Sequence, residues 1–220
     1  MYLPTYHEEK DLDVLHALIQ THPLGTWVSM TDGGLDANHI PFILDKSRGE
    51  LGVLRAHVAR ANPIWKMLSS DVPSIITFQG AQSYITPNWY PSKQIAGKVV
   101  PTWNYTVVHA HGIATVVEDR DWILQMVSDL TDRNEASKTL GHVGAAPWKV
   151  SDAPEEFIQR LLGAIVGIEI PITSIKGRWK LSQDEAMEDR IGTVKGLHEV
   201  GTTDAIALSD LVNSRINLEA

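Results

Sequence analysis

Cysteine is absent from the 220 residues of the sequence. This absence excludes disulfides, thiol catalysis and thiolate metal sites, and it makes a reducing cytoplasm the expected compartment. The sequence also has no run of about 18 uninterrupted apolar residues, so we expect no membrane span. The segment MYLPTYHEEKD (1–11) lacks the basic start and the apolar run of a signal peptide.

Several common functional motifs are missing as well. Without a GxGxxG or a Walker loop, a Rossmann or P-loop nucleotide site is not expected. Without a GxSxG elbow, a Ser-His-Asp hydrolase is poorly supported. His109 and His111 face the same side of a predicted strand, but no acidic third ligand stands at an obvious spacing in this segment. We therefore predict no metal site.

Positive charge is sparse. The formal net charge is −8, and no lysine- or arginine-rich run occurs. Proteins that grip DNA through its phosphates usually carry a basic face, so we expect weak or no direct DNA binding. The charge balance does not argue against a small phosphorylated ligand, which needs only a few well-placed cations.

The composition that remains is that of an ordinary globular protein, with 43% hydrophobic and 21% charged residues. The length suits a single domain over residues 1–220. Apolar periodicity predicts helices at 11–23, 121–132, 152–165 and about 203–216, with a short helix at 61–70. Asp152 is the expected cap of the 152–165 helix.

Strands are predicted between these helices, at 25–31, 38–45, 51–58, 107–119 and 166–182. Residues 32–37 would form the turn between the first two strands, and Pro171 should interrupt the last strand. Residues 73–87 read as a strand pair or as one bent strand around Gly80. Mostly antiparallel strands with peripheral helices indicate an α+β chain built on a small β-barrel.

The segment RAHVARANP (55–63) could bind an anion. Asn62 and Pro63 resemble a helix cap and a first helical residue, and Arg60 supplies a guanidinium fork, with His57 nearby. The alternative is that Arg60 is a solvated surface charge and His57 a core residue.

The segment FQGAQSYITPNWYPSK (78–93) could bind a planar heteroaromatic ligand. Gln82, Ser83 and Tyr84 offer polar groups beside an apolar strand, and Trp89 and Tyr90 follow in a loop bracketed by prolines. The alternative is an aromatic loop packed on its own core or on a second subunit.

Two further polar stretches stand near strand ends. Trp103 and Tyr105 could stack on a ring or fill a dimer interface, and Asn104 could hydrogen-bond a ring edge. Lys180, Ser182 and Gln183 form a polar cluster in GRWKLSQD (177–184), which could equally be an ordinary strand end leading to a capped helix.

Taken together, these stretches resemble the PaiB family of FMN-binding, negative transcriptional regulators. The resemblance covers nearly the whole chain, and its segments are MYLP, HPLGTWVS, NHIPFIL, HVARANPIW, FQGAQSYITPNWYPSK, VPTWNYTVVHAHG, LLGAIVGIEI and KLSQ. It implies a mainly antiparallel split β-barrel of the pyridoxamine-phosphate-oxidase type, and a homodimer with FMN at its interface.

The resemblance also implies roles for individual residues. The FMN phosphate would be held by Arg60, with help from His57 and Asn62. The polar edge of the isoalloxazine would face Gln82 and Ser83, and the second subunit would contribute Trp103 and Asn104. Lys180 and Gln183 are additional cofactor-binding candidates.

The sequence departs from the family pattern at two places. Tyr6 and His7 stand where the family has His and then Phe, and Asp184 replaces the Asn of the closing KLSQN motif. A carboxylate close to the flavin phosphate would repel it.

Three kinds of function follow from these observations. The first is an FMN-binding regulator, and the second is an FMN-dependent oxidoreductase of the flavin reductase, oxidase or haem-degrading type. The third is a structural dimer without cofactor. No catalytic residue can be assigned from the sequence, because a flavin supplies its own hydride chemistry.

Overall fold

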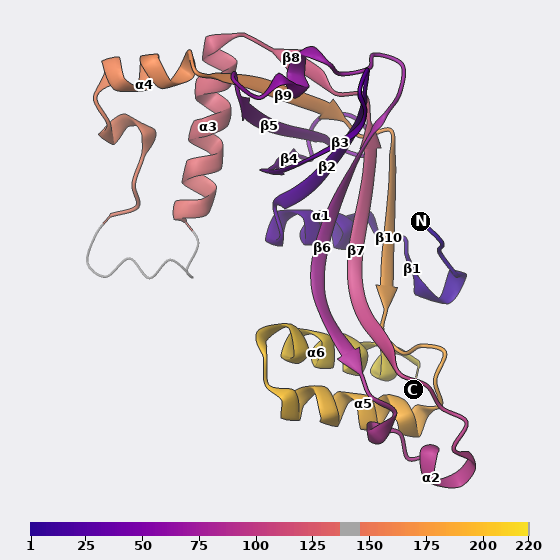
Figure 1. Ribbon diagram of the computed structural model, residues 1–220. Coiled ribbons are helices and arrows are strands. Elements are labelled where there is room, and N and C mark those ends of the chain that lie inside the picture. Colours follow the sequence, from indigo (N-terminus) through magenta and orange to yellow (C-terminus); the bar gives the residue numbers. More distant parts are fainter. Residues whose placement is uncertain (137–145, 220) are drawn as a thin grey trace. The chain divides into compact units, whose positions relative to one another are not determined.

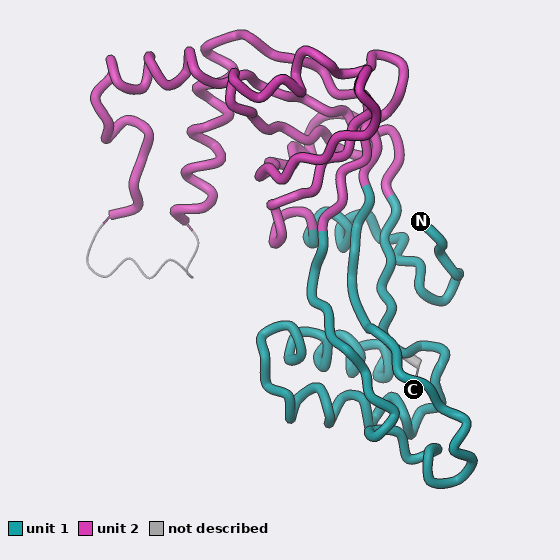
Figure 2. Tube along the Cα trace, in the orientation of Figure 1, with its two compact units in different colours: residues 1–18, 79–109, 176–220 teal, residues 19–78, 110–175 magenta. Residues whose placement is uncertain are grey.

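The computed structural model describes residues 1–136 and 146–219 (Figure 1). The chain divides into two compact units (Figure 2). Unit 1 comprises residues 1–18, 79–109 and 176–220, and unit 2 comprises residues 19–78 and 110–175. No helix in the described residues is long and apolar enough to cross a membrane.

The strands form two sheets, in which neighbouring strands run antiparallel (Figure 1). The six-stranded sheet has the order β1 (Glu8–Glu9), β10 (Ser174–Lys180), β7 (Thr102–Gly112), β6 (Ser74–Ile85), β2 (Leu24–Thr31) and β3 (Gly34–Pro41). The four-stranded sheet has the order β4 (Ile43–Asp45), β5 (Val53–Ala59), β9 (Ile165–Pro171) and β8 (Thr115–Val117). This is the predicted α+β class of mainly antiparallel, split-barrel type.

Helices connect and cover the strands. They are α1 (Leu12–Thr21), α2 (Lys93–Ala96), α3 (Arg120–Glu135), α4 (Glu155–Leu162), α5 (Met187–Val200) and α6 (Thr203–Glu219). Short 3₁₀ turns lie at Thr5–His7, Pro63–Lys66, Pro87–Trp89 and Val150–Asp152.

The core of unit 2 is apolar and includes residues of β2, of β6 and of the connection after β3. In the β2–β3 hairpin, Leu24 pairs with Pro41 and Thr31 with Gly34. Trp27, Phe42 and Phe78 are fully buried, and the two phenylalanine rings meet edge to face at 5.8 Å. Burying such rings removes a large apolar area from water, and this stabilises the unit.

Helix α3 packs on the four-stranded sheet. It begins at a conventional cap, because Asp119 accepts hydrogen bonds from the amides of Asp121 and Trp122 at 2.8 and 3.0 Å. The indole of Trp122 lies directly over Gly167 of β9, where an added Cβ would overlap the ring. The glycine therefore allows the helix to approach the sheet closely.

In unit 1, a helical hairpin packs beside the ends of long strands. The apolar core includes Leu15, Trp179, Leu181, Leu197, Ala205, Leu208 and Val212. Ser209 of α6 donates a hydrogen bond to the carbonyl of Val194 in α5 at 2.9 Å, so the two helices are also held by a polar contact.

Several predicted elements need correction. Residues 61–70 contain only a four-residue 3₁₀ turn. Of the two alternatives for residues 73–87, the structure has the single strand, β6. The strand predicted at 107–119 begins at Thr102 and is split into β7 and β8, because the chain changes sheet after Gly112. The predicted turn 32–37 is shorter, since β3 already begins at Gly34.

Two helices also differ from the prediction. Asp152 does not cap α4; its carboxylate accepts a hydrogen bond from the Lys149 amide at 2.9 Å and closes the preceding 3₁₀ turn. Pro154 stands at the α4 cap instead, without a side-chain cap bond. Helix α5 was missing from the prediction altogether.

Candidate functional site

The predicted site residues lie in both units. His57, Arg60 and Asn62 belong to unit 2, whereas Gln82, Ser83, Trp103, Asn104, Lys180 and Gln183 belong to unit 1.

Arg60 follows β5 and is held by its own unit. Its Nε and Nη2 donate to the carbonyls of Gly163 and Ile165 at 3.1 and 3.2 Å, and its Nη1 donates to Glu118 at 2.7 Å. The guanidinium also lies 5.5 Å from the ring of Trp65. Every nitrogen of this guanidinium has a protein partner, so Arg60 anchors the α4–β9 connection to the end of β5.

Asn62 and His57 also have their contacts within unit 2. The Asn62 carbonyl oxygen accepts from the Ile64 amide at 3.0 Å, which confirms the predicted cap, and its Nδ2 donates to Asn38 at 2.7 Å. His57 pairs with Gly167, the residue under Trp122, and burial lowers the pKa of its imidazole. Its Nδ1 has no hydrogen-bond partner in the described part of the chain.

In unit 1, aromatic and cationic side chains gather on one side of the sheet. Side chains alternate between the two faces of a strand, so Trp103 and Tyr105 of β7 share a face. The ring of Tyr84 on β6 meets the ring of Trp103 edge to face at 6.1 Å. Arg178 of β10 lies 5.4 Å from the ring of Tyr105, and Lys180 follows it on the same face. We call these five residues the aromatic–cationic face.

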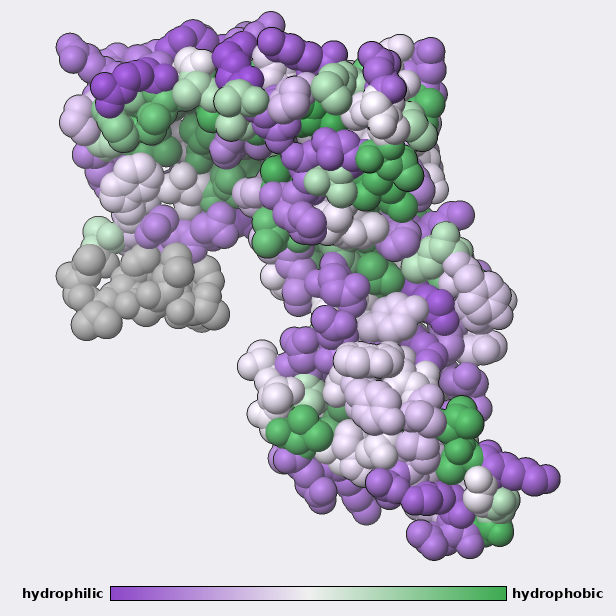
Figure 3. All heavy atoms as spheres, in the orientation of Figure 1, coloured by the Kyte–Doolittle hydropathy of each residue, from purple (hydrophilic) through white to green (hydrophobic). Residues whose placement is uncertain are grey.

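This face is open to solvent. Tyr84 is 48% exposed and Trp103 is 53% exposed. In the space-filling view, pale side chains of intermediate hydropathy gather over unit 1, while strongly polar side chains dominate its lower end (Figure 3). Exposed aromatic side chains of this kind offer flat surfaces on which a ring or another protein can pack.

Lys180 is fixed at the edge of the aromatic–cationic face. Its Nζ donates to the Thr102 hydroxyl and, at 3.1 Å, to the carbonyl of Trp103. Burial lowers the pKa of this ammonium group, and the nearby Asp184 carboxylate opposes that effect. The sequence predicts Lys180, Trp103, Tyr84 and Tyr105 as candidates for binding but not Arg178. The alternation of basic residues along the strand that ends in Lys180 was the available signal for Arg178.

Asn104 lies on the opposite side of β7 from Trp103. It is fully buried, and its Nδ2 donates to Ser182 at 2.9 Å. Its Oδ1 is also buried and has no hydrogen-bond partner among the described residues. Trp103 and Asn104 therefore do not line the same face of the sheet.

The remaining predicted residues of unit 1 are Gln183, Gln82 and Ser83, and they differ in hydrogen bonding and in exposure. Both polar atoms of the Gln183 amide are used locally, by the Leu181 amide at 2.7 Å and by the Trp179 carbonyl at 2.6 Å. This arrangement is the ordinary strand end that the sequence offered as an alternative. Gln82 is exposed on β6, whereas Ser83 is half-buried.

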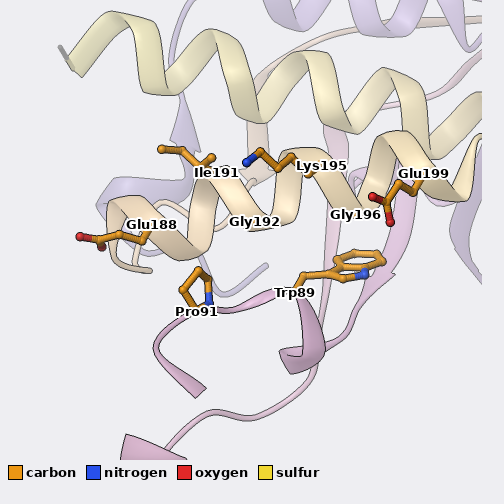
Figure 4. A pocket seen from close by; sticks show the side chains of 8 residues that line it. All are labelled: Trp89, Pro91, Glu188, Ile191, Gly192, Lys195, Gly196 and Glu199. Atoms are coloured by element: carbon orange, nitrogen blue, oxygen red, sulfur yellow. The ribbon is translucent and has the colours of Figure 1, made fainter. Parts of the chain in front are cut away.

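The loop of residues 86–92 packs on helix α5 (Figure 4). A Cβ added at Gly196 would overlap the indole of Trp89, and one added at Gly192 would meet the Trp89 carbonyl. Ser92 donates through its amide and its hydroxyl to Asp189, at 3.1 and 2.5 Å, and Tyr90 is buried.

This packing bears on the two roles offered for the loop from the sequence, which were binding of a planar ligand and packing on the protein's own core or on a second subunit. A hollow of about 450 Å³ remains between the loop and α5, but the Trp89 ring lies flat on the helix. Burial raises the pKa of the Tyr90 hydroxyl to about 12. The Trp-Tyr loop is thus packed on the protein itself and secures the helical hairpin.

The sequence matches one family over residues 1–174, a family described as "Putative FMN-binding domain". Relatives align over almost the full length. An uncharacterized protein of Aspergillus fumigatus is 32% identical, with 98% of this chain and 97% of the relative covered. A Bacillus subtilis protein, protease synthase and sporulation protein PAI 2, is 24% identical, with 98% of each chain covered.

Solved structures share the fold. The flavocytochrome Anf3 of Azotobacter vinelandii has a TM-score of 0.57 at 13% identity, covering 86% of this chain and 78% of that one. An FAD- and haem-binding protein of Mycobacterium smegmatis has a TM-score of 0.55 at 18% identity, covering 83% and 78%. At these identities the likeness concerns the fold alone.

Proposed function

The chain belongs to the FMN-binding domain family, of the PaiB type that its motifs indicate, and on this premise we propose that it binds FMN on the aromatic–cationic face of unit 1. The observation that carries the proposal is the exposed Tyr84–Trp103 pair beside two cations. Flat rings and a few fixed cations suit a planar ring with a phosphate tail.

Different residues of the aromatic–cationic face would bind the ring and the phosphate of FMN. Trp103 and Tyr84 would contact the isoalloxazine, and Lys180 and Arg178 would offset the phosphate charge. The Asp184 carboxylate lies near Lys180 and raises the pKa of its ammonium group against the larger effect of burial. Its own negative charge would repel the phosphate and weaken FMN binding, as the departure from the family motif suggests. When bound, FMN supplies its own electron and hydride chemistry.

The proposal is tested by titrating the protein with FMN while flavin fluorescence is recorded. We expect saturable quenching, and a loss of about fivefold or more in affinity for Trp103→Ala, because stacking of a ring on an aromatic side chain is worth roughly 1–3 kcal/mol. Trp148→Ala is the matched control, since Trp148 is 45% exposed and lies in unit 2.

A second comparison isolates the phosphate. Riboflavin has the same ring without the phosphate, so Lys180→Ala should weaken FMN binding and leave riboflavin binding almost unchanged. Equal losses for both ligands would remove Lys180 from the phosphate site. An absence of quenching by either ligand would reject the proposal as a whole.

The biological role that we favour is regulation in the cytoplasm. The Bacillus subtilis relative is a protease synthase and sporulation protein by name, and a flavin-binding regulator is compatible with that name. With a net charge of −8, direct binding to DNA phosphates is disfavoured, so regulation would act through another partner.

The openness of the face supports an FMN-dependent oxidoreductase as the second candidate. Because Tyr84 and Trp103 are about half exposed, a soluble reductant could reach a flavin held there. NADH or NADPH added to the FMN-loaded protein should then bleach the flavin absorbance. No bleaching with either reductant would favour the regulatory role.

We also propose a homodimer in which a second copy covers part of unit 1. Ile95 is 88% exposed and Val100 is 74% exposed, and both precede Trp103 in the chain. Apolar side chains that gather on a surface are often covered by a subunit contact.

A further inference from the structure

The N-terminal segment of residues 1–9 is attached to β10 largely through Arg178. Glu8 and Glu9 pair with Arg178 and Gly177 in the sheet. The Arg178 Nη1 donates to the carbonyl of Tyr2 at 3.1 Å, and the guanidinium carbon lies 5.7 Å from the Tyr2 ring. The same guanidinium touches Tyr105, so Arg178 links this segment to the aromatic–cationic face.

His7 is the buried residue of the segment. It is only 2% exposed, and its ring stands between a cation and an anion. The Arg178 Nη2 lies 3.5 Å from Nδ1, and the Asp184 Oδ1 lies 3.7 Å from Nε2. A guanidinium can only donate, so Nδ1 is the acceptor and Nε2 carries the proton that faces Asp184. The geometry thus selects one neutral tautomer.

A second proton on His7 would have to sit on Nδ1, directly against Arg178. Burial, the largest effect, lowers the pKa of His7, and the charges of Arg178 and Lys180 lower it further, while Asp184 raises it. His7 and Arg215 of α6 line a common hollow of about 230 Å³, but the Arg215 guanidinium is paired with the Glu9 carboxylate. The neighbouring Glu8 lies 3.3 Å from Lys10.

We propose that residues 1–9 form a pH-dependent latch over Arg178, closed while His7 is neutral and open when His7 is protonated. In the open state His7 is solvated and titrates near its ordinary pKa of about 6.5. The closed state binds a proton less readily, so closure is favoured above that pH and is lost progressively as the pH falls towards the lowered pKa.

Opening the latch would free the Arg178 donors that Tyr2 and His7 now occupy. If the proposed function holds, these donors become available to the FMN phosphate, so this consequence rests on that function. The latch itself does not depend on flavin and can be tested without it.

The absence of cysteine allows the test to be site-specific. A nitroxide spin label on Leu3→Cys, in the flavin-free protein, reports the mobility of the segment by electron paramagnetic resonance. We expect a restricted spectrum at about pH 8 and a mobile one at about pH 5, since these values bracket the histidine titration. A label on Glu50→Cys, an exposed position of unit 2, controls for effects of pH on the label.

Two variants decide whether His7 is responsible. His7→Phe should abolish the transition, because the ring no longer titrates. Asp184→Asn should move its midpoint to higher pH, since without the carboxylate that raises the His7 pKa the closed state binds a proton even less readily. An unchanged midpoint in Asp184→Asn would mean that Asp184 has no part in the latch. Should Leu3 stay equally restricted at both pH values, or should the transition persist in His7→Phe, the latch is rejected.

Failure of the latch and failure of the proposed function give different results. The spin-label measurement contains no flavin, so a protein that does not bind FMN still reports whether the segment opens. Conversely, FMN quenching with an immobile latch would leave the proposed function intact and remove only this inference.

Discussion

Arg60 and Arg178 show at the residue scale how neighbours decide what a cation can do. Both lie beside an aromatic ring. The donors of Arg60 are held by two main-chain carbonyls and Glu118 within unit 2. Those of Arg178 are held by Tyr2 and His7 of the N-terminal segment, which we propose to open with pH. Arg178 is therefore the better candidate for contact with a ligand, although the sequence motif pointed to Arg60.

Replacement of Arg60 separates these two roles. In Arg60→Ala we expect a loss of about 1–2 kcal/mol in the free energy of unfolding, because charge-assisted hydrogen bonds to carbonyls are removed from a partly exposed site. FMN affinity should change little. Urea unfolding and a flavin titration on the same preparation measure both quantities.

The control for this prediction is Glu118→Gln, which removes the charge of the partner and leaves the carbonyl bonds in place. It should cost less stability than Arg60→Ala. If Arg60→Ala instead kept full stability and lost FMN affinity by about 1.5–3 kcal/mol, the phosphate site would belong to Arg60, as the family resemblance implied.

At the scale of elements, the loop of residues 86–92 and helix α5 form one structural unit. Gly192 and Gly196 give the helix a flat side, and Trp89 and Pro91 occupy it (Figure 4). Ser92 adds two hydrogen bonds to the buried Asp189. The loop is therefore the attachment point of the C-terminal helices.

This contact predicts an unusual result for a glycine in a helix. Gly196→Ala should lose about 1–3 kcal/mol in the free energy of unfolding, because the methyl group would overlap the Trp89 indole. The intrinsic preference of a helix for alanine, about 1 kcal/mol, acts in the opposite direction. Lys195→Ala is the control, since Lys195 is exposed on the same helix. A stabilised Gly196→Ala protein would contradict the packing of Trp89 described above.

The sequence predicted most helices and strands but not helix α5, and the residues of α5 explain why. Helix α5 contains Gly192 and Gly196, which are poor helix formers, and it buries the polar residues Asp189, Arg190 and Thr193, so neither residue preference nor burial pattern indicates a helix here. By contrast, α6 and α3 were predicted because their apolar residues repeat at helical spacing. The split between β7 and β8 was missed because the apolar alternation continues across Gly112, while the partner strand changes.

The candidate site was predicted in part for a related reason. Single residue types such as Trp103 and Lys180 were recognised, but their shared face depends on which strands are neighbours. That order, with β10 beside β7 and β7 beside β6, is a long-range property of the chain. Asn104 was grouped with Trp103 because they are adjacent in sequence, although alternation places them on opposite faces.

At the scale of the whole molecule, the exposed apolar residues of unit 1 bear on the oligomeric state. If a second copy covers Ile95 and Val100, sedimentation should give a dimer, and Val100→Asp should shift the protein towards the monomer because a buried charge is costly. Leu35→Asp is the matched control, since Leu35 is also 74% exposed but lies in unit 2. A monomer for the unmodified protein, or equal effects of both substitutions, would reject this interface.

The most direct measurement is a crystal structure of the protein grown with FMN. Our account predicts flavin density against Tyr84 and Trp103, with the phosphate near Lys180 and Arg178. Flavin density against Arg60 and Asn62, with the aromatic–cationic face of unit 1 left bare, would contradict it.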